Sequence, residues 1–269
     1  MKIGTRDFQT TDKTYVMGIL NVTPDSFSDG GRWNRMDAAL CHVEEMLSQG
    51  MDVLDIGGES TRPGYTLLSD QEEIDRVVPV IEAVKARFDV PISLDTYKSA
   101  VAAAGLAAGA DLINDIWGLK YDPEMAQVIA GAGVPCCLMH NRREARYGLF
   151  FVDLLEDLKG SLRLAEEAGI SRDSIILDPG VGFGKSYRNN LECIRRLPEL
   201  RSAFGLPVLL GASRKSVIGL TLDLPADDRL EGTLATTVMA VMAGCMFVRV
   251  HDVEANVRAV RMTEAVCHG

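Results

Sequence analysis

The chain alternates eight times between a short β-rich segment and a segment of helical length, and this alternation most constrains its fold. Several of the helical segments end in a glycine directly before the next strand, as in "SQGMDVLDI", which is typical of a short helix-to-strand connection. The expected strands span residues 15–20, 52–56, 91–95, 111–115, 134–140, 174–178, 207–212 and 246–250. The expected helices span residues 36–49, 70–88, 98–108, 123–132, 152–169, 188–204, 231–244 and 254–266.

Eight strand-then-helix units of this length predict a parallel sheet covered by helices, which when closed is a (β/α)₈ TIM barrel of the α/β class. An open doubly wound sheet is the rival, but its first strand would be expected to lead into a GxGxxG turn, whereas "NVTPDS" stands here. The chain has 269 residues, of which 47% are hydrophobic, and no linker or change in composition divides it. We therefore expect a single barrel domain over residues 1–269.

Charge and composition exclude several classes of partner. Lys and Arg number 28 against 38 Asp and Glu, a formal net charge of −10, which disfavours non-specific binding to nucleic acid or anionic membranes. No apolar run is long enough to span a bilayer, and no signal-peptide pattern opens the chain. The six cysteines form no CxxC pair and fit neither a zinc site nor a disulfide scaffold. We expect a cytoplasmic protein that acts on small molecules.

Each expected strand is followed by polar residues at its carboxyl end. In a barrel these ends meet at one rim, where the strand-to-helix loops build the active site. An arginine beside an apolar core is costly unless an anionic group meets it. The polar residues are Asn21, Asp55, Asp95, Asn114, His140, Asp178, Ser213 with Lys215, and Arg249 with His251.

Each of these residues also has a purely structural interpretation. An aspartate after a strand is most often a helix N-cap or a turn residue. For Asp55 and Asp95 this structural role is as plausible as a functional one, and for Asn114 it is favoured. A structural role is favoured for His140, because a lone histidine is usually a satisfied core residue. Arg249 is harder to dismiss, since arginine is seldom buried without a partner. The coincidence of eight such positions on one rim favours a site.

The residue types indicate the chemistry of the ligand. Carboxylates and an amide at the bottom of a pocket suit a flat heterocycle with several N–H donors, since two neighbouring donors match one carboxylate. Cationic side chains at the rim, namely Arg62, Arg249 and His251, suit phosphate. The sequence thus indicates a polar aromatic ring attached to an anionic group.

Five motifs in register closely resemble the dihydropteroate synthase family, from about residue 15 to residue 255: "MGILNVTPDSFSDGG", "DIGGESTRPG", "LDPGVGFGK", "GASRKSVIG" and "VRVHDV". The resemblance implies a (β/α)₈ barrel and a transferase of folate biosynthesis that is a target of sulfonamides. Its reaction would condense 6-hydroxymethyl-7,8-dihydropterin diphosphate with 4-aminobenzoate, giving 7,8-dihydropteroate and diphosphate. It further implies a homodimer and Mg²⁺ as cofactor.

The resemblance also assigns roles to individual residues. Arg249 and His251 would bind the diphosphate, and Asn21 would be the Mg²⁺ ligand. Residues implied to bind the pterin are Asp95, Asn114, Asp178 and Lys215. Residues implied to line the aminobenzoate site or its covering loops are Thr61, Arg62, Pro63, Phe183, Ser213 and Ser216, the last receiving the aminobenzoate carboxylate.

The implied reaction breaks the bond to diphosphate largely before the amine attacks. Asp95 and Asp178 would stabilise positive charge on the pterin, and Lys215 and Arg249 complete the implied catalytic set. Mg²⁺, Arg249 and His251 would neutralise the departing diphosphate, so that no enzymic nucleophile is required.

Two long loops, at about 21–35 and 57–69, are expected to close over the site and to exclude water. The first would bring in Asp25 and Phe27, and the second Arg62 and Pro63. The basic segment "LMHNRREARYG" departs from the family pattern, so no role is assigned to His140, Asn141 or Arg142. Arg214 is expected to point away from Lys215 and to stack or form a salt bridge.

Two other functions compete with this one. A corrinoid-dependent methyltransferase would share the barrel and the pterin pocket but needs no diphosphate site, which "ESTRPG", "SRKS" and "RVHD" indicate here. A non-catalytic pterin-binding protein would have lost residues among Asn21, Arg62, Lys215 or Arg249, and all four are present.

Overall fold

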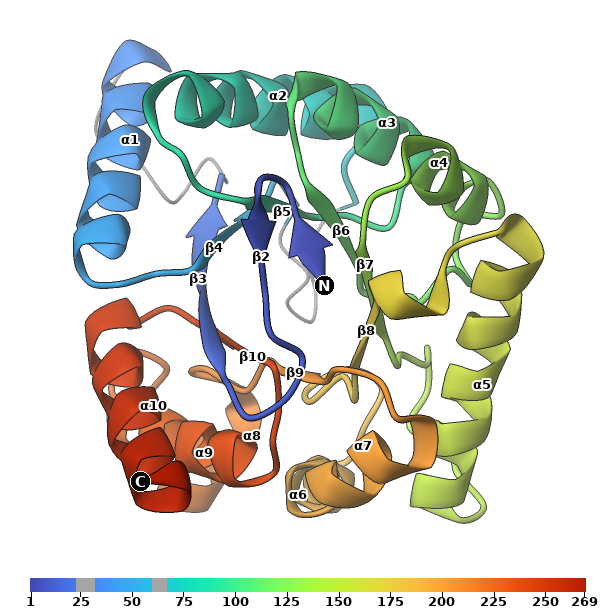
Figure 1. Cartoon of the computed structure of the whole chain (residues 1–269). Helices are drawn as coiled ribbons and strands as arrows, with labels where there is room; N and C mark the ends of the chain where they lie inside the picture. Colours follow the sequence, from blue (N-terminus) through green and yellow to red (C-terminus); the bar gives the residue numbers. More distant parts are fainter. Residues whose placement is uncertain (23–31, 60–66) are drawn as a thin grey trace.

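The computed structural model describes residues 1–22, 32–59 and 67–269, and its strands form a barrel surrounded by helices (Figure 1). Eight parallel strands pair in the order β8-β7-β6-β5-β4-β3-β10-β9. A bridge between Leu177 and Val208 links the two ends of this order. The strands are β3 (Tyr15–Asn21), β4 (Val53–Gly57), β5 (Ile92–Asp95), β6 (Leu112–Asp115), β7 (Cys136–Met139), β8 (Ile175–Asp178), β9 (Leu209–Leu210) and β10 (Phe247–Val250). The predicted (β/α)₈ barrel is confirmed, and the open doubly wound sheet is excluded.

The helices follow the strands as predicted, with two differences. They are α1 (Arg32–Ser48), α2 (Asp70–Arg87), α3 (Ser99–Ala108), α4 (Met125–Ala132), α5 (Phe150–Ala168), α6 (Tyr187–Arg195), α7 (Leu197–Phe204), α8 (Ser216–Leu222), α9 (Leu230–Met242) and α10 (Val253–His268). The predicted helix 188–204 is two helices, because the backbone at Arg196 leaves the helical region and Pro198 starts a new helix. Helix α8 was not predicted, since its seven residues are too few for a periodic pattern.

An amino-terminal hairpin, also not predicted, fills one end of the barrel. Its strands β1 (Lys2–Ile3) and β2 (Arg6–Asp7) lie in front of the barrel strands in Figure 1. Ile3 and Phe8 join the interior apolar cluster, in which the Phe8 ring centroid lies 4.8 Å from that of Tyr15 and 5.8 Å from that of Phe247. Two-residue strands leave almost no alternation to detect, so only packing against the barrel defines the hairpin.

The alternation of side chains divides each strand between two cores. In β6, Leu112 belongs to the interior cluster and Ile113 to the outer cluster under the helices. Asn114 follows on the same face as Leu112 and therefore points into the barrel, one pleat closer to the carboxyl end. The interior is thus apolar at the hairpin end and polar at the opposite rim.

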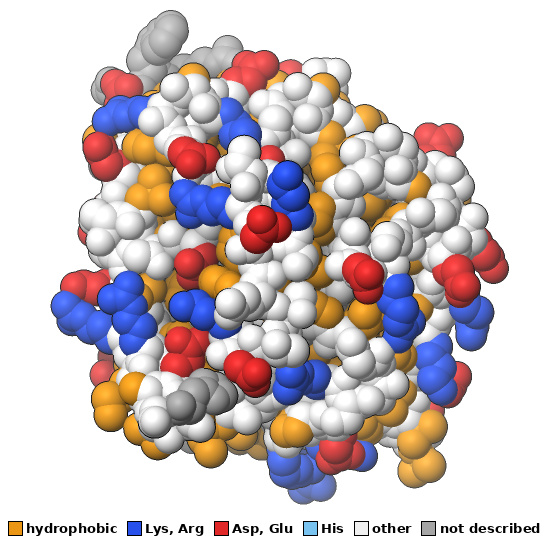
Figure 2. Space-filling model, viewed as in Figure 1, with side chains coloured by type: hydrophobic (Ala, Val, Ile, Leu, Met, Phe, Trp, Pro, Cys, Tyr) orange, Lys and Arg blue, Asp and Glu red, His pale blue; other side chains and the backbone are white. Residues whose placement is uncertain are grey.

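The surface around the hairpin carries both signs of charge. Figure 2 shows Lys and Arg side chains interspersed with Asp and Glu over this face. That distribution differs from the basic surface of a nucleic-acid-binding protein. None of the helices in the described ranges combines the length and apolar character needed to cross a membrane.

The hairpin yields a test of the fold. Phe8→Ala should lower the free energy of unfolding by about 3 kcal/mol, because the substitution opens a cavity among buried rings. Urea denaturation measures this, with Leu149→Ala as the exposed control, for which about 0.5 kcal/mol or less is expected. A Phe8→Ala protein as stable as its parent would show that the hairpin does not stabilise the barrel.

Candidate active site

Strand register brings four rim positions into one layer. Asn21 pairs with Gly57, Gly57 with Asp95, and Asp95 with Asn114. Gly57 contributes no side chain to this layer. A Cβ atom there would lie 3.6 Å from Asp95 Cβ and 3.9 Å from Asn21 Oδ1. The glycine therefore leaves open space between the Asn21 amide and the Asp95 carboxylate.

Beneath this layer, Arg249 is held between two carboxylates. Its Nε donates to Asp55 Oδ2 at 2.6 Å, and one terminal nitrogen donates to Asp95 Oδ2 at 2.6 Å. Asp55 Oδ1 accepts from Ser93 Oγ at 2.5 Å and from Asn114 Nδ2 at 3.5 Å. Asp55 is fully buried inside β4, so it is not a helix cap. The anionic partners that Arg249 requires are thus supplied by the protein itself.

Burial and neighbouring charges move the pKa values of this group. Burial raises the pKa of Asp95 to about 7, with Arg249 opposing the shift and the Asp55 charge adding to it. Burial alone would lower the pKa of Arg249, but the two carboxylates outweigh it and raise that pKa. Arg249 therefore stays charged, while Asp95 is poised close to neutral pH.

The structure also corrects the interpretation of Asn114 as a cap. Its neighbour Asp115 stabilises the turn after β6 instead, since the Asp115 carboxylate accepts from the backbone N–H groups of Trp117 (2.8 Å) and Leu119 (2.6 Å). Asn114 turns inward instead and reaches Asp55.

Asp178 and Lys215 converge on the opposite side of the rim. A Cβ atom at Gly211 would lie 3.7 Å from both Asp178 Oδ2 and Lys215 Nζ, and 3.9 Å from Arg249 Cβ. These three side chains therefore surround the same space above Gly211. Burial raises the pKa of Asp178 and lowers that of Lys215 to about 8, and each group opposes the shift of the other. Lys215 is thus cationic at neutral pH.

The loop after β8 contacts both residues of this pair. The Gly180 N–H donates to Asp178 Oδ1 at 2.7 Å, and Lys215 Nζ donates to the Val181 carbonyl at 2.6 Å. The same amino group lies 4.7 Å from the centroid of the Phe183 ring. Phe183, predicted for the aminobenzoate side, is therefore adjacent to Lys215.

The remaining predicted residues of this rim lie beside Lys215. Ser213 Oγ is 3.0 Å from His251 Nδ1, which joins the loop after β9 to the end of β10. Ser216 is exposed and begins α8. The salt bridge expected for Arg214 is confirmed: its Nε donates to Asp252 Oδ2 at 3.0 Å.

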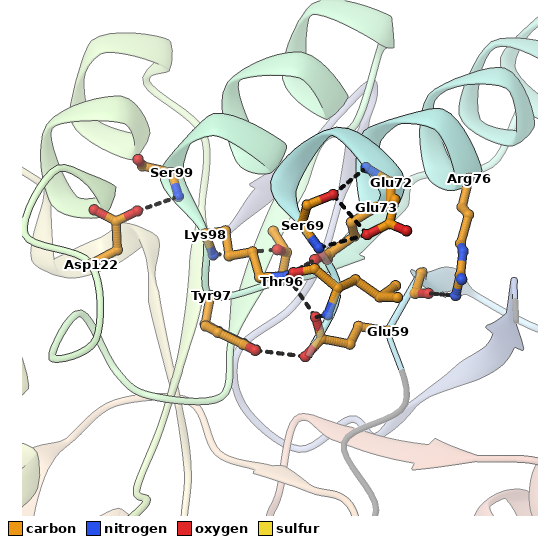
Figure 3. A network of polar contacts seen from close by, with 12 residues as sticks. Glu59, Ser69, Glu72, Glu73, Arg76, Thr96, Tyr97, Lys98, Ser99 and Asp122 are labelled. Atoms are coloured by element: carbon orange, nitrogen blue, oxygen red, sulfur yellow. Dashed lines mark hydrogen bonds and ion pairs between the residues drawn. The ribbon is translucent and has the colours of Figure 1, made fainter. Parts of the chain in front are cut away.

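Five predicted residues lie outside the described residues: Asp25, Phe27, Thr61, Arg62 and Pro63. Both flanks of the segment 60–66 are nevertheless joined by one buried network (Figure 3). Lys98 Nζ donates to Glu59 Oε2 at 2.5 Å, to the Leu68 carbonyl at 2.9 Å and to Glu73 Oε2 at 2.8 Å. Tyr97 donates to Glu59 Oε1 at 2.6 Å. Sequence reasoning missed this network, because its members come from three separate elements.

His140 stands apart from the convergence. It is fully buried, and its Nε2 lies 2.9 Å from Asp157 Oδ2. Burial lowers its pKa to about 4, with the charge of Lys185 adding to that effect. The structural role favoured for this histidine agrees with its position.

This arrangement can be compared with known proteins. Residues 17–251 match the family described as pterin binding enzyme. The chain is 55% identical to the dihydropteroate synthase of Clostridium beijerinckii over 267 residues, which is 99% of each chain. The chain belongs to this pterin-binding enzyme family.

Solved structures agree with this assignment. A dihydropteroate synthase from Clostridium difficile, solved in the presence of pteroic acid, superimposes with a TM-score of 0.93 at 47% identity and covers 100% of both chains. The Yersinia pestis enzyme, solved as a sulfonamide drug complex, superimposes with a TM-score of 0.91 at 44% identity. The match covers 99% of this chain and 98% of that one. The chain accordingly has the activity of its relatives, that of a dihydropteroate synthase, a transferase of folate biosynthesis.

The Lys98 network yields a prediction about stability. Lys98→Met should lower the free energy of unfolding by about 3 kcal/mol at pH 7, because it leaves the carboxylates of Glu59 and Glu73 buried without their cation. Burial raises the pKa of Glu73 and Lys98 opposes that rise, so in the variant the folded-state Glu73 carboxyl binds its proton more tightly than in the unfolded chain. The difference in unfolding free energy between the variant and the parent protein should therefore become smaller as the pH falls from 7 towards 5.

Urea denaturation at several pH values measures both effects. Lys159→Met is the matched control, since its ion pair with Glu156 is exposed and contributes about 0.5 kcal/mol or less. A urea denaturation midpoint of Lys98→Met equal to that of the parent protein would contradict the prediction.

Proposed function

We propose that the carboxyl rim of the barrel is where this enzyme binds the pterin diphosphate and joins it to 4-aminobenzoate. The observation that carries the proposal is the convergence of Asp178, Lys215 and Arg249 around Gly211. An anionic acceptor at Asp178 beside the Lys215 cation, with the Arg249 side chain adjacent, suits a heterocycle with N–H donors whose substituent carries negative charge.

The pterin ring would be held by four residues from four strand ends. Asp178 would accept from the two neighbouring donors of the guanidine-like part of the ring, and Asn114 and Asp95 would bond its other edge. Lys215 would reach the ring from the aminobenzoate side. Asp55 would act on these residues rather than on the ring, because it is fully buried beneath Asn114 and Arg249.

The carboxylates would also favour the reaction. Positive charge spreads through the pterin as its bond to diphosphate breaks, and fixed negative charges at Asp95 and Asp178 stabilise it without reorganisation. Because positive charge favours the ionised form of a neighbouring carboxyl, the charge that develops on the pterin would favour ionised Asp95 despite its raised pKa. Arg249 and His251 would supply positive charge near the departing diphosphate.

The aminobenzoate would lie on the side of Phe183, Ser213 and Ser216, with Ser216 receiving its carboxylate. Thr61, Arg62 and Pro63, and the loop residues Asp25 and Phe27, keep their predicted roles in covering the site. A related enzyme forms a complex with a sulfonamide drug, so we propose that this chain is a sulfonamide target as well.

Magnesium fits the rim through one protein ligand. The described residues contain no cluster of three or more His, Cys, Asp or Glu placed to hold a metal ion. Mg²⁺ commonly keeps several waters and binds through one or two protein oxygens together with substrate phosphates. The Asn21 amide oxygen, beside the space left by Gly57, suits this mode. When bound, the ion would neutralise charge on the diphosphate.

The last helices support a homodimer. Large apolar side chains are exposed on neighbouring helices α9 and α10, with Met242 69% exposed and Val266 72% exposed. Leu220 is also exposed, on helix α8, which contacts α9. Side chains of this kind favour a protein interface. The single domain over residues 1–269 and the cytoplasmic location remain predictions.

Sedimentation velocity tests the dimer. The parent protein should sediment at twice the monomer mass, and Met242→Lys should shift it towards the monomer, because a charge would be buried at the interface. A parent protein that is monomeric at micromolar concentration would contradict the proposal.

The assay that tests the function measures diphosphate release that depends on 4-aminobenzoate. Lys215→Ala and Asp178→Asn should each lower kcat/KM about 100-fold or more, since each removes a group that faces the reacting substrate. Chelation of Mg²⁺ should also lower the rate in the parent protein.

Lys159→Ala serves as the exposed control and should match the parent. Release that does not depend on 4-aminobenzoate, or variants that match the parent, would contradict the proposal. A methyltransferase or a non-catalytic binding protein would give no diphosphate in this assay.

A further inference from the structure

The loop 179–185, between β8 and α6, carries two groups of the rim. Its Val181 carbonyl accepts from Lys215, and its Phe183 ring lies against the same amino group. The loop belongs to neither a helix nor a strand, so the regular backbone hydrogen bonds of those elements do not hold it in place. Other contacts must therefore set its position.

Lys185, at the end of this loop, directs its amino group to protein acceptors. Nζ donates to the Phe183 carbonyl at 2.9 Å, to the His140 carbonyl at 3.2 Å, and to His140 Nδ1 at 2.8 Å. An ammonium group has three N–H donors, and three acceptors are present. The bonding capacity of Lys185 is thus used within the protein rather than on a ligand.

His140 is suited to accept this bond because of its own surroundings. Its Nε2 lies 2.9 Å from Asp157 Oδ2, so Nε2 carries the proton and Nδ1 presents a lone pair to Lys185. Asp157 also accepts from Arg142 Nε at 2.6 Å. Burial lowers the pKa of His140 to about 4 and that of Lys185 to about 8, so that at neutral pH the histidine is neutral and the lysine charged.

The two segments also approach each other closely along their backbones. A Cβ atom at Gly180 would lie 1.9 Å from the His140 carbonyl oxygen, and one at Gly184 would lie 2.1 Å from that of Arg142. Both glycines have positive φ. Tyr147 adds a bond from its hydroxyl to the Gly184 carbonyl at 2.6 Å. The basic segment after β7, which has no other assigned role, thus packs closely against the backbone of the loop 179–185.

We propose that His140 and Lys185 are a pair of positioning residues that hold the loop 179–185 and so place Phe183 for 4-aminobenzoate. The pair touches no substrate and acts through the Phe183 backbone. This inference rests on the proposed aminobenzoate site at Phe183. The loop also contacts the pterin residues Asp178 and Lys215, through Gly180 and Val181. Lys185, however, bonds the carbonyl of Phe183 itself, and Asp95 and Asn114 lie in strands that the loop does not hold. The pair should therefore affect the second substrate more than the first.

Steady-state kinetics with both substrates tests the pair. Lys185→Met keeps the length of the side chain and removes its three donors. We expect it to raise KM for 4-aminobenzoate about 10-fold, because small displacements of positioning groups have large effects, while KM for the pterin diphosphate changes about twofold or less. A general loss of stability would instead lower the active fraction, and with it the apparent kcat, leaving both KM values unchanged.

Tyr147→Phe provides a milder second variant if Lys185→Met does not fold. It removes one hydroxyl and its bond to the Gly184 carbonyl, and should raise KM for 4-aminobenzoate about threefold on the same physical grounds. Lys159→Met, an exposed lysine on α5, should leave both KM values unchanged.

The outcomes separate this inference from the proposed function. Folded Lys185→Met and Tyr147→Phe proteins with the parent KM for 4-aminobenzoate would overturn the positioning role. If Lys185→Met does not fold, an unchanged KM in Tyr147→Phe alone would overturn it. A parent protein without aminobenzoate-dependent diphosphate release would overturn the proposed function instead.

Discussion

The polar interior of the barrel depends on the ion pairs between Arg249 and the carboxylates of Asp55 and Asp95. Two carboxylates that share one guanidinium, with Asp55 fully buried and Asp95 partly buried, would repel each other strongly without that cation. The guanidinium group meets this requirement because its fork presents separate donors to separate acceptors. Asp55 in turn bonds Ser93 and Asn114, so that one arginine on β10 fixes side chains from three other strands, β4, β5 and β6. The geometry of the rim is built on this buried group.

Much of the barrel was predictable because its strands follow local rules. Apolar runs bounded by glycine, and the polar residues directly after them, can be recognised in the sequence itself. Parallel strands then bring their carboxyl ends together at one rim. Asp95, Asn114, Asp178, Lys215 and Arg249 were all placed on one rim in this way. Their individual roles depend on ligand contacts, which the pattern does not determine.

Other features lay beyond local rules because they depend on contacts between distant segments. Asp55 resembles a turn residue in the sequence, and only its pairing with Arg249, 194 positions away, distinguishes it. The amino-terminal hairpin consists of very short strands, and the Lys98 network of residues far apart in the sequence. Both are therefore recognised only from the packing of the folded chain. His140 was predicted to be structural, but its partner Lys185 comes from the motif "LDPGVGFGK", in which only Asp178 and Phe183 were assigned roles.

The hairpin at the base of the barrel has a consequence for the order of events. Since Ile3 and Phe8 fill that end, molecules enter the interior from the rim and leave by the same route. A compound that rests on Asn114 therefore lies deeper than one bound nearer the rim, and it has to bind first.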